Sequence, residues 1–97
     1  MALTRQNIMD ELGAMRAELS RLYSVERIGV FGSFARGEET PESDVDILVE
    51  LSEPTFDHYM DLKFALEDRF GRSVDLVMPD ALKPRMKPSV EREIVYA

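Results

Sequence analysis

The chain of 97 residues contains no cysteine and only one histidine, His58. The lack of thiols excludes disulfides, thiolate metal sites and a cysteine nucleophile. With a single imidazole, a zinc site built from histidines is excluded as well. Any metal must therefore be held by oxygen ligands, which points to magnesium, manganese or calcium.

Long apolar runs are also missing. The longest uninterrupted apolar run is only a few residues, which excludes a transmembrane helix, and the N-terminus lacks the apolar stretch of a signal peptide. We therefore expect no membrane association and a cytoplasmic location. The composition, with 44% hydrophobic and 32% charged residues, and the length fit one compact globular domain over residues 1–97.

Basic residues are in the minority, with 12 Lys and Arg against 19 Asp and Glu and a formal net charge of −7. Direct DNA binding is not expected, because affinity for nucleic acid depends largely on Lys and Arg that neutralise phosphates. The charge is unevenly distributed. Segment 38–53 carries seven acids and no basic residue, whereas segment 83–92 carries four basic residues and one acid.

Apolar periodicity and turn residues predict a small α+β domain, with a short mixed sheet and helices packed on it. Thr4 is the expected N-cap of the first helix and Gly71 the expected C-cap of the second. Gly29, inside the first strand, indicates a close approach of another part of the chain. The expected order is helix 4–22, strand 25–31, one helical turn at 34–37, loop 38–43, a strand from 44 that stops before Pro54, helix 56–70, strand 73–78 and helix 90–96.

Three aspartates have positions that suggest chemistry. Asp44 and Asp46 lie two apart at the start of one predicted strand, and Asp75 lies inside the next. Side chains two apart on a strand face the same way, and Asp75 can join the pair if the two strands are neighbours. Three converging carboxylates repel one another unless a cation lies among them, which favours a divalent metal. The alternative is structural: Asp44 caps a turn, Asp46 faces solvent and Asp75 pairs with an arginine.

The turn from Gly32 to Gly37 leaves a strand and opens into a helical turn, where free backbone N–H groups favour anions. Gly32 would let a phosphate approach the backbone, the Ser33 hydroxyl could donate to it, and Arg36 could supply positive charge. The alternative is a plain turn in which Ser33 caps the helix and Arg36 pairs with a surface acid.

The two elements together resemble the signature of the polymerase β nucleotidyltransferase superfamily. Gly32-Ser33 is followed eleven residues later by Asp44-Val45-Asp46, which is similar to its G-S, D-x-D pattern. The string from Gly32 to Val49 is similar in particular to the minimal nucleotidyltransferase (MNT) members.

This resemblance implies a polymerase β-like nucleotidyltransferase fold and a transferase activity that uses a nucleoside triphosphate. The Gly32-Ser33 turn would hold the triphosphate, with Arg36 nearby. Asp44 and Asp46 match the aspartates that bind two Mg²⁺ ions in that family. Asp75 matches the third metal aspartate, which helps the acceptor hydroxyl lose its proton.

The resemblance also implies a partner. MNT members are typically antitoxins paired with a HEPN ribonuclease toxin in a hetero-oligomeric complex, and transfer AMP from ATP to a tyrosine of that toxin. The leading hypothesis is therefore an ATP-binding, Mg²⁺-dependent protein adenylyltransferase of a toxin-antitoxin system. Two alternatives stay open: an antitoxin that only binds and occludes its toxin, and a nucleotidyltransferase that acts on a small molecule or RNA.

Other segments carry weaker hypotheses. Lys83, Arg85 and Lys87 could bind triphosphate or an acidic partner, with a solvated connector as the alternative. Phe34, Phe56 and Tyr96 are candidates for an exposed partner surface, with core packing as the alternative.

Overall fold

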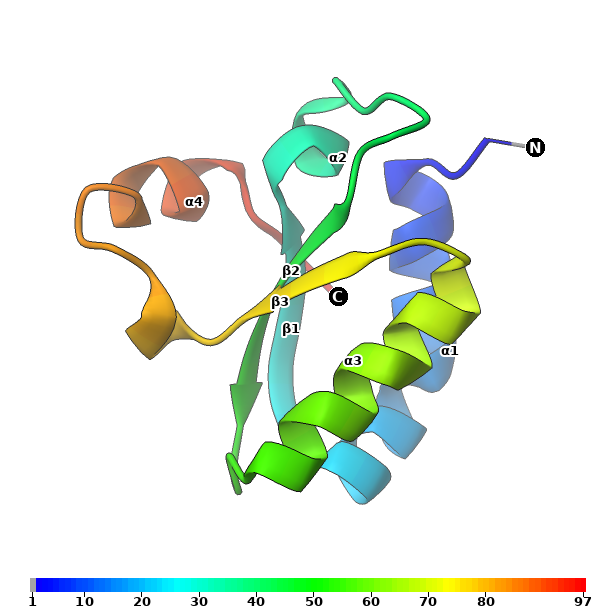
Figure 1. Cartoon of the computed structure of the whole chain (residues 1–97), viewed down its shortest axis with the longest axis vertical. Coiled ribbons are helices and arrows are strands. Elements are labelled where there is room, and N and C mark those ends of the chain that lie inside the picture. Colours follow the sequence, from blue (N-terminus) through cyan, green and yellow to red (C-terminus); the bar gives the residue numbers. More distant parts are fainter. Residues whose placement is uncertain (1) are drawn as a thin grey trace.

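The computed structural model describes residues 2–97, in which helices and strands alternate around one sheet (Figure 1). Figure 1 shows α1 and α3 side by side on one face of the sheet and α4 on the other. The elements are α1 (Arg5–Tyr23), β1 (Val25–Phe31), α2 (Gly32–Arg36), β2 (Val45–Leu51), α3 (Phe56–Phe70), β3 (Val74–Val77), the 3-10 turn η1 (Pro79–Ala81), α4 (Lys87–Glu93) and β4 (Val95–Tyr96).

The two long helices begin and end at capping residues. Thr4 forms a capping box with Asn7 at the start of α1, and the hydroxyl of Thr55 accepts a hydrogen bond from the His58 backbone N–H at the start of α3. Gly71 ends α3 in the left-handed conformation. These caps confirm the predicted helices to within one residue. No helix within residues 2–97 combines the length and apolarity that a membrane crossing would need.

The sheet has the strand order β3-β2-β1-β4 and is mixed, as predicted. β1 pairs antiparallel with β2 and with β4, whereas β2 and β3 run parallel. A parallel pair needs a long crossover, which α3 provides. The parallel register places Asp46 directly opposite Asp75. The condition under which Asp75 can join the metal candidates is therefore met.

Most of the apolar core lies between the sheet and the pair α1 and α3. On the other face, under α4, the described residues 2–97 form a smaller buried cluster of Phe31, Leu48 and Val90. The expectation that Phe34 is exposed is wrong, because its side chain is fully buried in the larger core. Phe56, by contrast, is 76% exposed. The larger core contains, among others, Ile8, Leu12, Leu19, Val30, Ile47, Val49, Leu62 and Leu66.

The outer edge of β3 is covered by side chains of α3. The carboxylate of Glu67 accepts a hydrogen bond of 3.0 Å from the Val74 backbone N–H, and the hydroxyl of Tyr59 donates to the Leu76 carbonyl. These bonds satisfy backbone groups that an edge strand otherwise leaves open to pairing with another chain.

Both predicted ends of the terminal helix, 90 and 96, are wrong. α4 begins earlier, with Pro88 in its first turn, and ends at Glu93, and the chain then pairs with β1 as β4. Gly29 makes this pairing possible, because a Cβ there would lie 2.9 Å from side-chain atoms of Ile94 and Tyr96. The close approach predicted from Gly29 is thus confirmed, and the segment that approaches is the C-terminal strand.

Candidate active site

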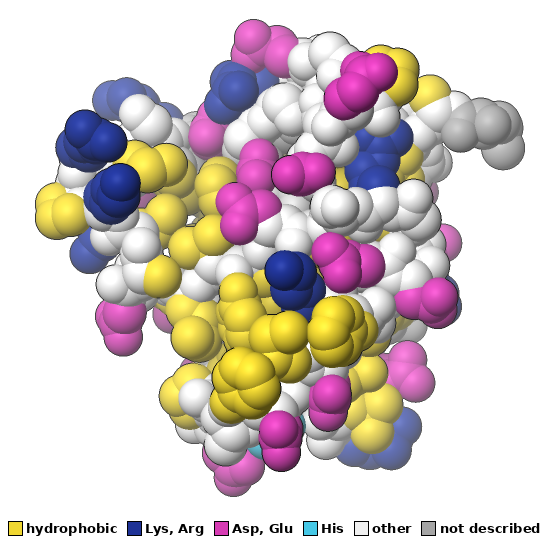
Figure 2. All heavy atoms as spheres, viewed as in Figure 1, with side chains coloured by type: hydrophobic (Ala, Val, Ile, Leu, Met, Phe, Trp, Pro, Cys, Tyr) yellow, Lys and Arg dark blue, Asp and Glu magenta, His cyan; other side chains and the backbone are white. Residues whose placement is uncertain are grey.

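A cleft of about 590 Å³ opens on the α4 face of the sheet, between α2, α4 and the N-terminal ends of β2 and β3. Five of the six residues predicted for the site line it: Gly32, Ser33, Arg36, Asp46 and Asp75. In Figure 2, acidic side chains gather in the middle of this view, and basic side chains lie to their left on the α4 side. The remaining lining residues are Phe31, Arg85, Met86, Ser89, Val90 and Glu93.

Asp46 and Asp75 lie next to each other on the floor of the cleft. They are register partners of the parallel strands, and their neighbours along each strand, such as Ile47 and Leu76, belong to the larger core. Because successive side chains on a strand alternate between faces, both aspartates face away from that core. The sheet itself therefore places two carboxylates together at one point.

Asp44 does not line this cleft. β2 begins only at Val45, so Asp44 is an exposed residue of the preceding loop, and its direction is set by that loop rather than by the alternation of a strand. The prediction that Asp44 and Asp46 converge because both lie on one strand is therefore wrong, since only Asp46 lies on β2. Asp44 is still close enough to influence the charge state of Asp46.

Arg72, which the sequence reasoning missed, holds that loop. Its Nη1 donates hydrogen bonds of 2.9 Å to the Ser43 carbonyl and 3.3 Å to the Thr40 carbonyl, and its guanidinium lies 5.1 Å from the centre of the Phe34 ring. Since Ser43 directly precedes Asp44, Arg72 fixes the backbone from which the Asp44 side chain extends.

The carboxylates of the site lack a compensating cation. Burial, together with the negative charges of Asp75, Asp44 and Glu93, raises the pKa of Asp46 from 3.8 to about 6, and the positive charge of Arg36 only partly offsets this rise. Within residues 2–97 no ion pair joins Asp75 to an arginine, so the structural alternative for that residue is wrong. The arrangement therefore favours a positive ligand at Asp46 and Asp75.

Gly32 is required by the close approach of Asp46. Its φ is +73°, in the left-handed region, and a Cβ built on it would lie 2.0 Å from Oδ2 of Asp46. No other residue type fits without displacing that carboxylate. The glycine thus keeps the turn and the first cleft aspartate in contact, in addition to the access for phosphate predicted from the sequence.

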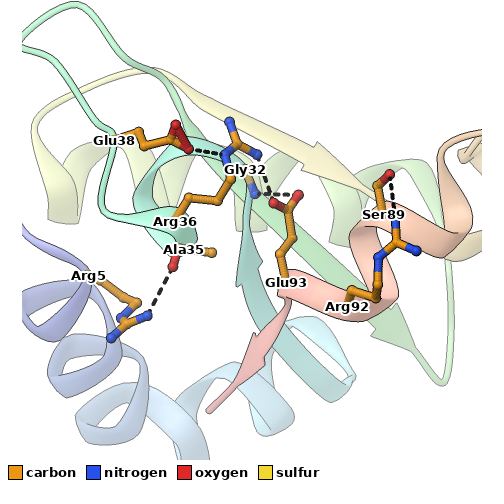
Figure 3. Close-up of polar contacts among 8 residues, drawn as sticks. All are labelled: Arg5, Gly32, Ala35, Arg36, Glu38, Ser89, Arg92 and Glu93. Carbon is orange, nitrogen blue, oxygen red and sulfur yellow. Dashed lines mark hydrogen bonds and ion pairs between the residues drawn. The ribbon is translucent and has the colours of Figure 1, made fainter.

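Arg36 is paired with the surface acid Glu38, as the alternative reading of the turn predicts, and also with Glu93 of the cleft lining. Its Nε lies 2.7 Å from Oε1 of Glu38 and its Nη1 lies 2.7 Å from Oε2 of Glu93 (Figure 3). Glu93 also accepts a hydrogen bond of 3.2 Å from the Gly32 backbone N–H. Sequence reasoning missed Glu93, because nothing in the local pattern around residue 93 points to a turn 61 residues away.

Comparison with known proteins decides the family. The model of the family described as "Nucleotidyltransferase domain" matches residues 12–97, which include every element of the cleft. The chain belongs to the nucleotidyltransferase domain family. The resemblance stated from Gly32-Ser33 and Asp44-Val45-Asp46 is confirmed, and the chain is an enzyme of the nucleotidyltransferase class.

Two relatives match over nearly their whole length. The protein adenylyltransferase MntA of Thermococcus cleftensis is 44% identical over 95 residues, which cover 97% of this chain and 96% of the relative. A solved structure of a minimal nucleotidyltransferase has a TM-score of 0.80 and 35% identity, over 96% of this chain and 95% of that one. The nucleotidyltransferase fold expected from the sequence is thereby confirmed.

A more distant structure shares the fold alone. It contains a tri-AMPylated HEPN toxin of Shewanella oneidensis in complex with an MNT antitoxin. The TM-score is 0.66 at 17% identity, over 96% of this chain and 71% of the matched chain.

The donor set of this nucleotidyltransferase cleft fits Mg²⁺. Within residues 2–97 no group of three or more His, Asp or Glu side chains is arranged so that it could hold a metal ion. Mg²⁺ is commonly bound by only one or two protein carboxylates, with waters and substrate phosphates completing its octahedron. Asp46 and Asp75 supply such a pair, and the raised pKa of Asp46 indicates that a cation would stabilise it.

Proposed function

We propose that this nucleotidyltransferase transfers AMP from ATP to a tyrosine of a partner HEPN toxin and so acts as its antitoxin, with Mg²⁺ as cofactor. One observation carries the proposal: the sheet holds Asp46 and Asp75 side by side in a cleft whose wall is the Gly32 turn. The name of the Thermococcus relative supports a protein as acceptor, because that relative is matched over 96% of its length.

The residues of the cleft have two roles, phosphate binding and metal binding. The N–H groups and hydroxyl of Gly32 and Ser33 bind the phosphates of ATP, and Arg36 adds positive charge at the same wall. Asp46 and Asp75 would hold the metal, and Asp44, whose charge acts on Asp46 from the adjacent loop, is the predicted third ligand. Mg²⁺, when bound there, neutralises the triphosphate and activates the acceptor hydroxyl.

The transfer itself is a single displacement. The tyrosine oxygen forms a bond to the α-phosphorus of ATP, the bond to the bridging oxygen breaks, and pyrophosphate leaves. Asp75 assists loss of the hydroxyl proton, which passes to solvent. Because little covalent chemistry falls to the protein, the rate depends mainly on positioning and charge, which the cleft residues supply.

The test is a labelling experiment. The purified protein is incubated with Mg²⁺, each α-labelled nucleoside triphosphate in turn, and a lysate of its source cell. We expect one labelled protein with ATP, lost in the double variant Asp44→Asn, Asp46→Asn and kept in Asp57→Asn, which removes one charge from the exposed start of α3. Label in RNA or small molecules, or undiminished label with the double variant, would contradict the proposal.

The same variants separate catalysis from occlusion. If the proposal holds, the double variant no longer protects cells that express the toxin, although it still folds. Full protection by the double variant would mean that the protein neutralises its toxin by binding alone.

A further inference from the structure

Glu93, at the end of α4, contacts the Gly32 turn and Arg36, which form the proposed phosphate-binding wall of the cleft. Its Oε1 accepts a hydrogen bond of 3.2 Å from the Gly32 backbone N–H, and its Oε2 lies 2.7 Å from Nη1 of Arg36. The Glu93 side chain is 19% exposed, against 48% for Arg36. One carboxylate thus occupies both the backbone donor and the cation that an anionic ligand of this wall would use (Figure 3).

Two features oppose a carboxylate at this position. Glu93 is the last residue of α4, and the C-terminus of a helix carries partial negative charge that disfavours an anion. It also lines the same cleft as Asp46 and Asp75, whose charges repel it. Its place therefore depends on the contacts with Gly32 and Arg36, which are the contacts that a phosphate would make.

We propose that Glu93 is an internal competitor for the phosphates of the nucleotide and thereby sets its affinity. The inference rests on the proposed function, since it assumes that the Gly32 turn and Arg36 receive the triphosphate. A ligand must displace Glu93 from both donors before it binds. The cost of this displacement lowers the affinity for every ligand that uses both donors, so Glu93 controls how tightly the wall binds phosphates.

Removal of the competitor is expected to tighten binding. Glu93→Gln keeps the size of the side chain and removes its charge, and Glu93→Ala removes the acceptor altogether. The matched control is Glu91→Gln, which changes the net charge equally from an exposed position of the same helix that does not line the cleft. The measurement is the Kd of a non-hydrolysable ATP analogue and of AMP with Mg²⁺, by titration calorimetry, after thermal unfolding has shown that each variant is folded.

The expected result is a lower Kd for the ATP analogue by about tenfold in Glu93→Gln, which is the usual worth of one such interaction, with Glu91→Gln like the natural protein. The Kd of AMP should fall by a similar factor, because both ligands displace the same carboxylate. Affinity that is unchanged or weaker in Glu93→Gln relative to Glu91→Gln would overturn the proposal and would make Glu93 a brace that supports the turn.

A measurement on the natural protein gives a second readout. The Gly32 amide proton signal should shift when the ATP analogue replaces the Glu93 carboxylate, and Glu91→Gln should show the same shift. Binding without any change at Gly32 would overturn the competition while leaving the proposed function intact. If neither the natural protein nor any variant binds a triphosphate, both the proposed function and the competition by Glu93 are contradicted.

Discussion

The two faces of the sheet differ in what they bury. The face under α1 and α3 covers a large apolar core in which many side chains, Leu62 and Ile47 among them, are fully inaccessible. The α4 face buries a small cluster of Phe31, Leu48 and Val90, and beside this cluster it presents Asp46 and Asp75 to an open cleft.

This difference separates stability from chemistry within one sheet. Apolar burial is the main favourable contribution to folding, and it is concentrated on the α1 and α3 face. Because strand residues alternate, each strand of the cleft contributes to both faces: in β2, Ile47 packs into the core while its neighbour Asp46 faces the site. The rigid core thereby fixes the position of carboxylates that would repel one another if they were alone.

The largest expected effect is on folding and tests this contrast directly. Leu62→Ala, on the α3 face, should reduce the free energy of unfolding by about 4 kcal/mol, because it leaves a cavity in a fully buried site. Leu48→Ala, the same change on the α4 face, should cost about 2 kcal/mol, because its smaller cluster borders the cleft and can relax. Denaturant unfolding measures both. Equal losses in the free energy of unfolding would mean that the two faces contribute equally to stability, which would contradict the contrast.

Gly32→Ala should affect the site more than the fold. A Cβ at this position overlaps the Asp46 carboxylate, so transfer should fall about a hundredfold as that group is displaced. Gly37→Ala is the matched control: its φ is +72°, close to that of Gly32, but among residues 2–97 no atom beyond its chain neighbours and local helix backbone lies within 4 Å of the added Cβ. Both variants should lose similar stability through backbone strain. If Gly37→Ala lost as much activity, strain rather than the contact with Asp46 would explain the result.

Arg72→Met should slow the reaction without unfolding the protein. Loss of the hydrogen bonds to the Thr40 and Ser43 carbonyls loosens the loop that carries Asp44, and we expect kcat to fall about tenfold with a smaller change in KM for ATP. Arg69→Met is the control, since Arg69 pairs with Glu11 on the far helices. Faster hydrogen exchange at the Ser43 amide, which donates to the Thr40 carbonyl, should accompany the effect. An unchanged kcat would show that the loop needs no such support.

The smallest expected effect is a gain in stability. The folded protein holds the Asp46 proton up to about pH 6, whereas the ordinary pKa is 3.8, so ionisation of Asp46 lowers stability as the pH rises from about 4 to about 6. Asp46→Asn removes this loss and should stabilise the metal-free protein by about 1 kcal/mol above pH 6, since solvent screens this half-buried group. The gain should vanish below pH 4. Thermal unfolding of Asp46→Asn between about pH 4 and about pH 6, with Asp57→Asn as control, measures this gain in stability. A gain that is independent of pH would contradict the raised pKa of Asp46.

Much of the fold is predictable because its signals are local. Thr4, Thr55 and Gly71 mark helix ends through contacts with residues a few positions away, and the apolar period of 56–70 matches α3 to the residue. The tail is not predictable in this way. Residues 95–96 form a strand only because β1 offers an edge at Gly29, a contact far along the chain that outweighs the local preference for one more helical turn.

The site also contains residues that local patterns predict and residues that they do not. The strand pattern and the turn lead to Gly32, Ser33, Asp46 and Asp75, because each lies at a recognisable position of a local element. Arg72 and Glu93 escape such reasoning. They act through hydrogen bonds to residues 29 and 61 positions away, which only the assembled sheet and α4 bring together.

Localisation of the metal tests the central claim most directly. Mn²⁺ can replace Mg²⁺ and broadens the NMR signals of nearby nuclei, so a titration with Mn²⁺ and a non-hydrolysable ATP analogue maps the site. The account predicts broadening at Gly32, Asp46 and Asp75, none in the middle of α1, and its loss in Asp46→Asn. Broadening confined to the other acids of segment 38–53, or undiminished in Asp46→Asn, would contradict the assignment of this cleft as the nucleotide and metal site.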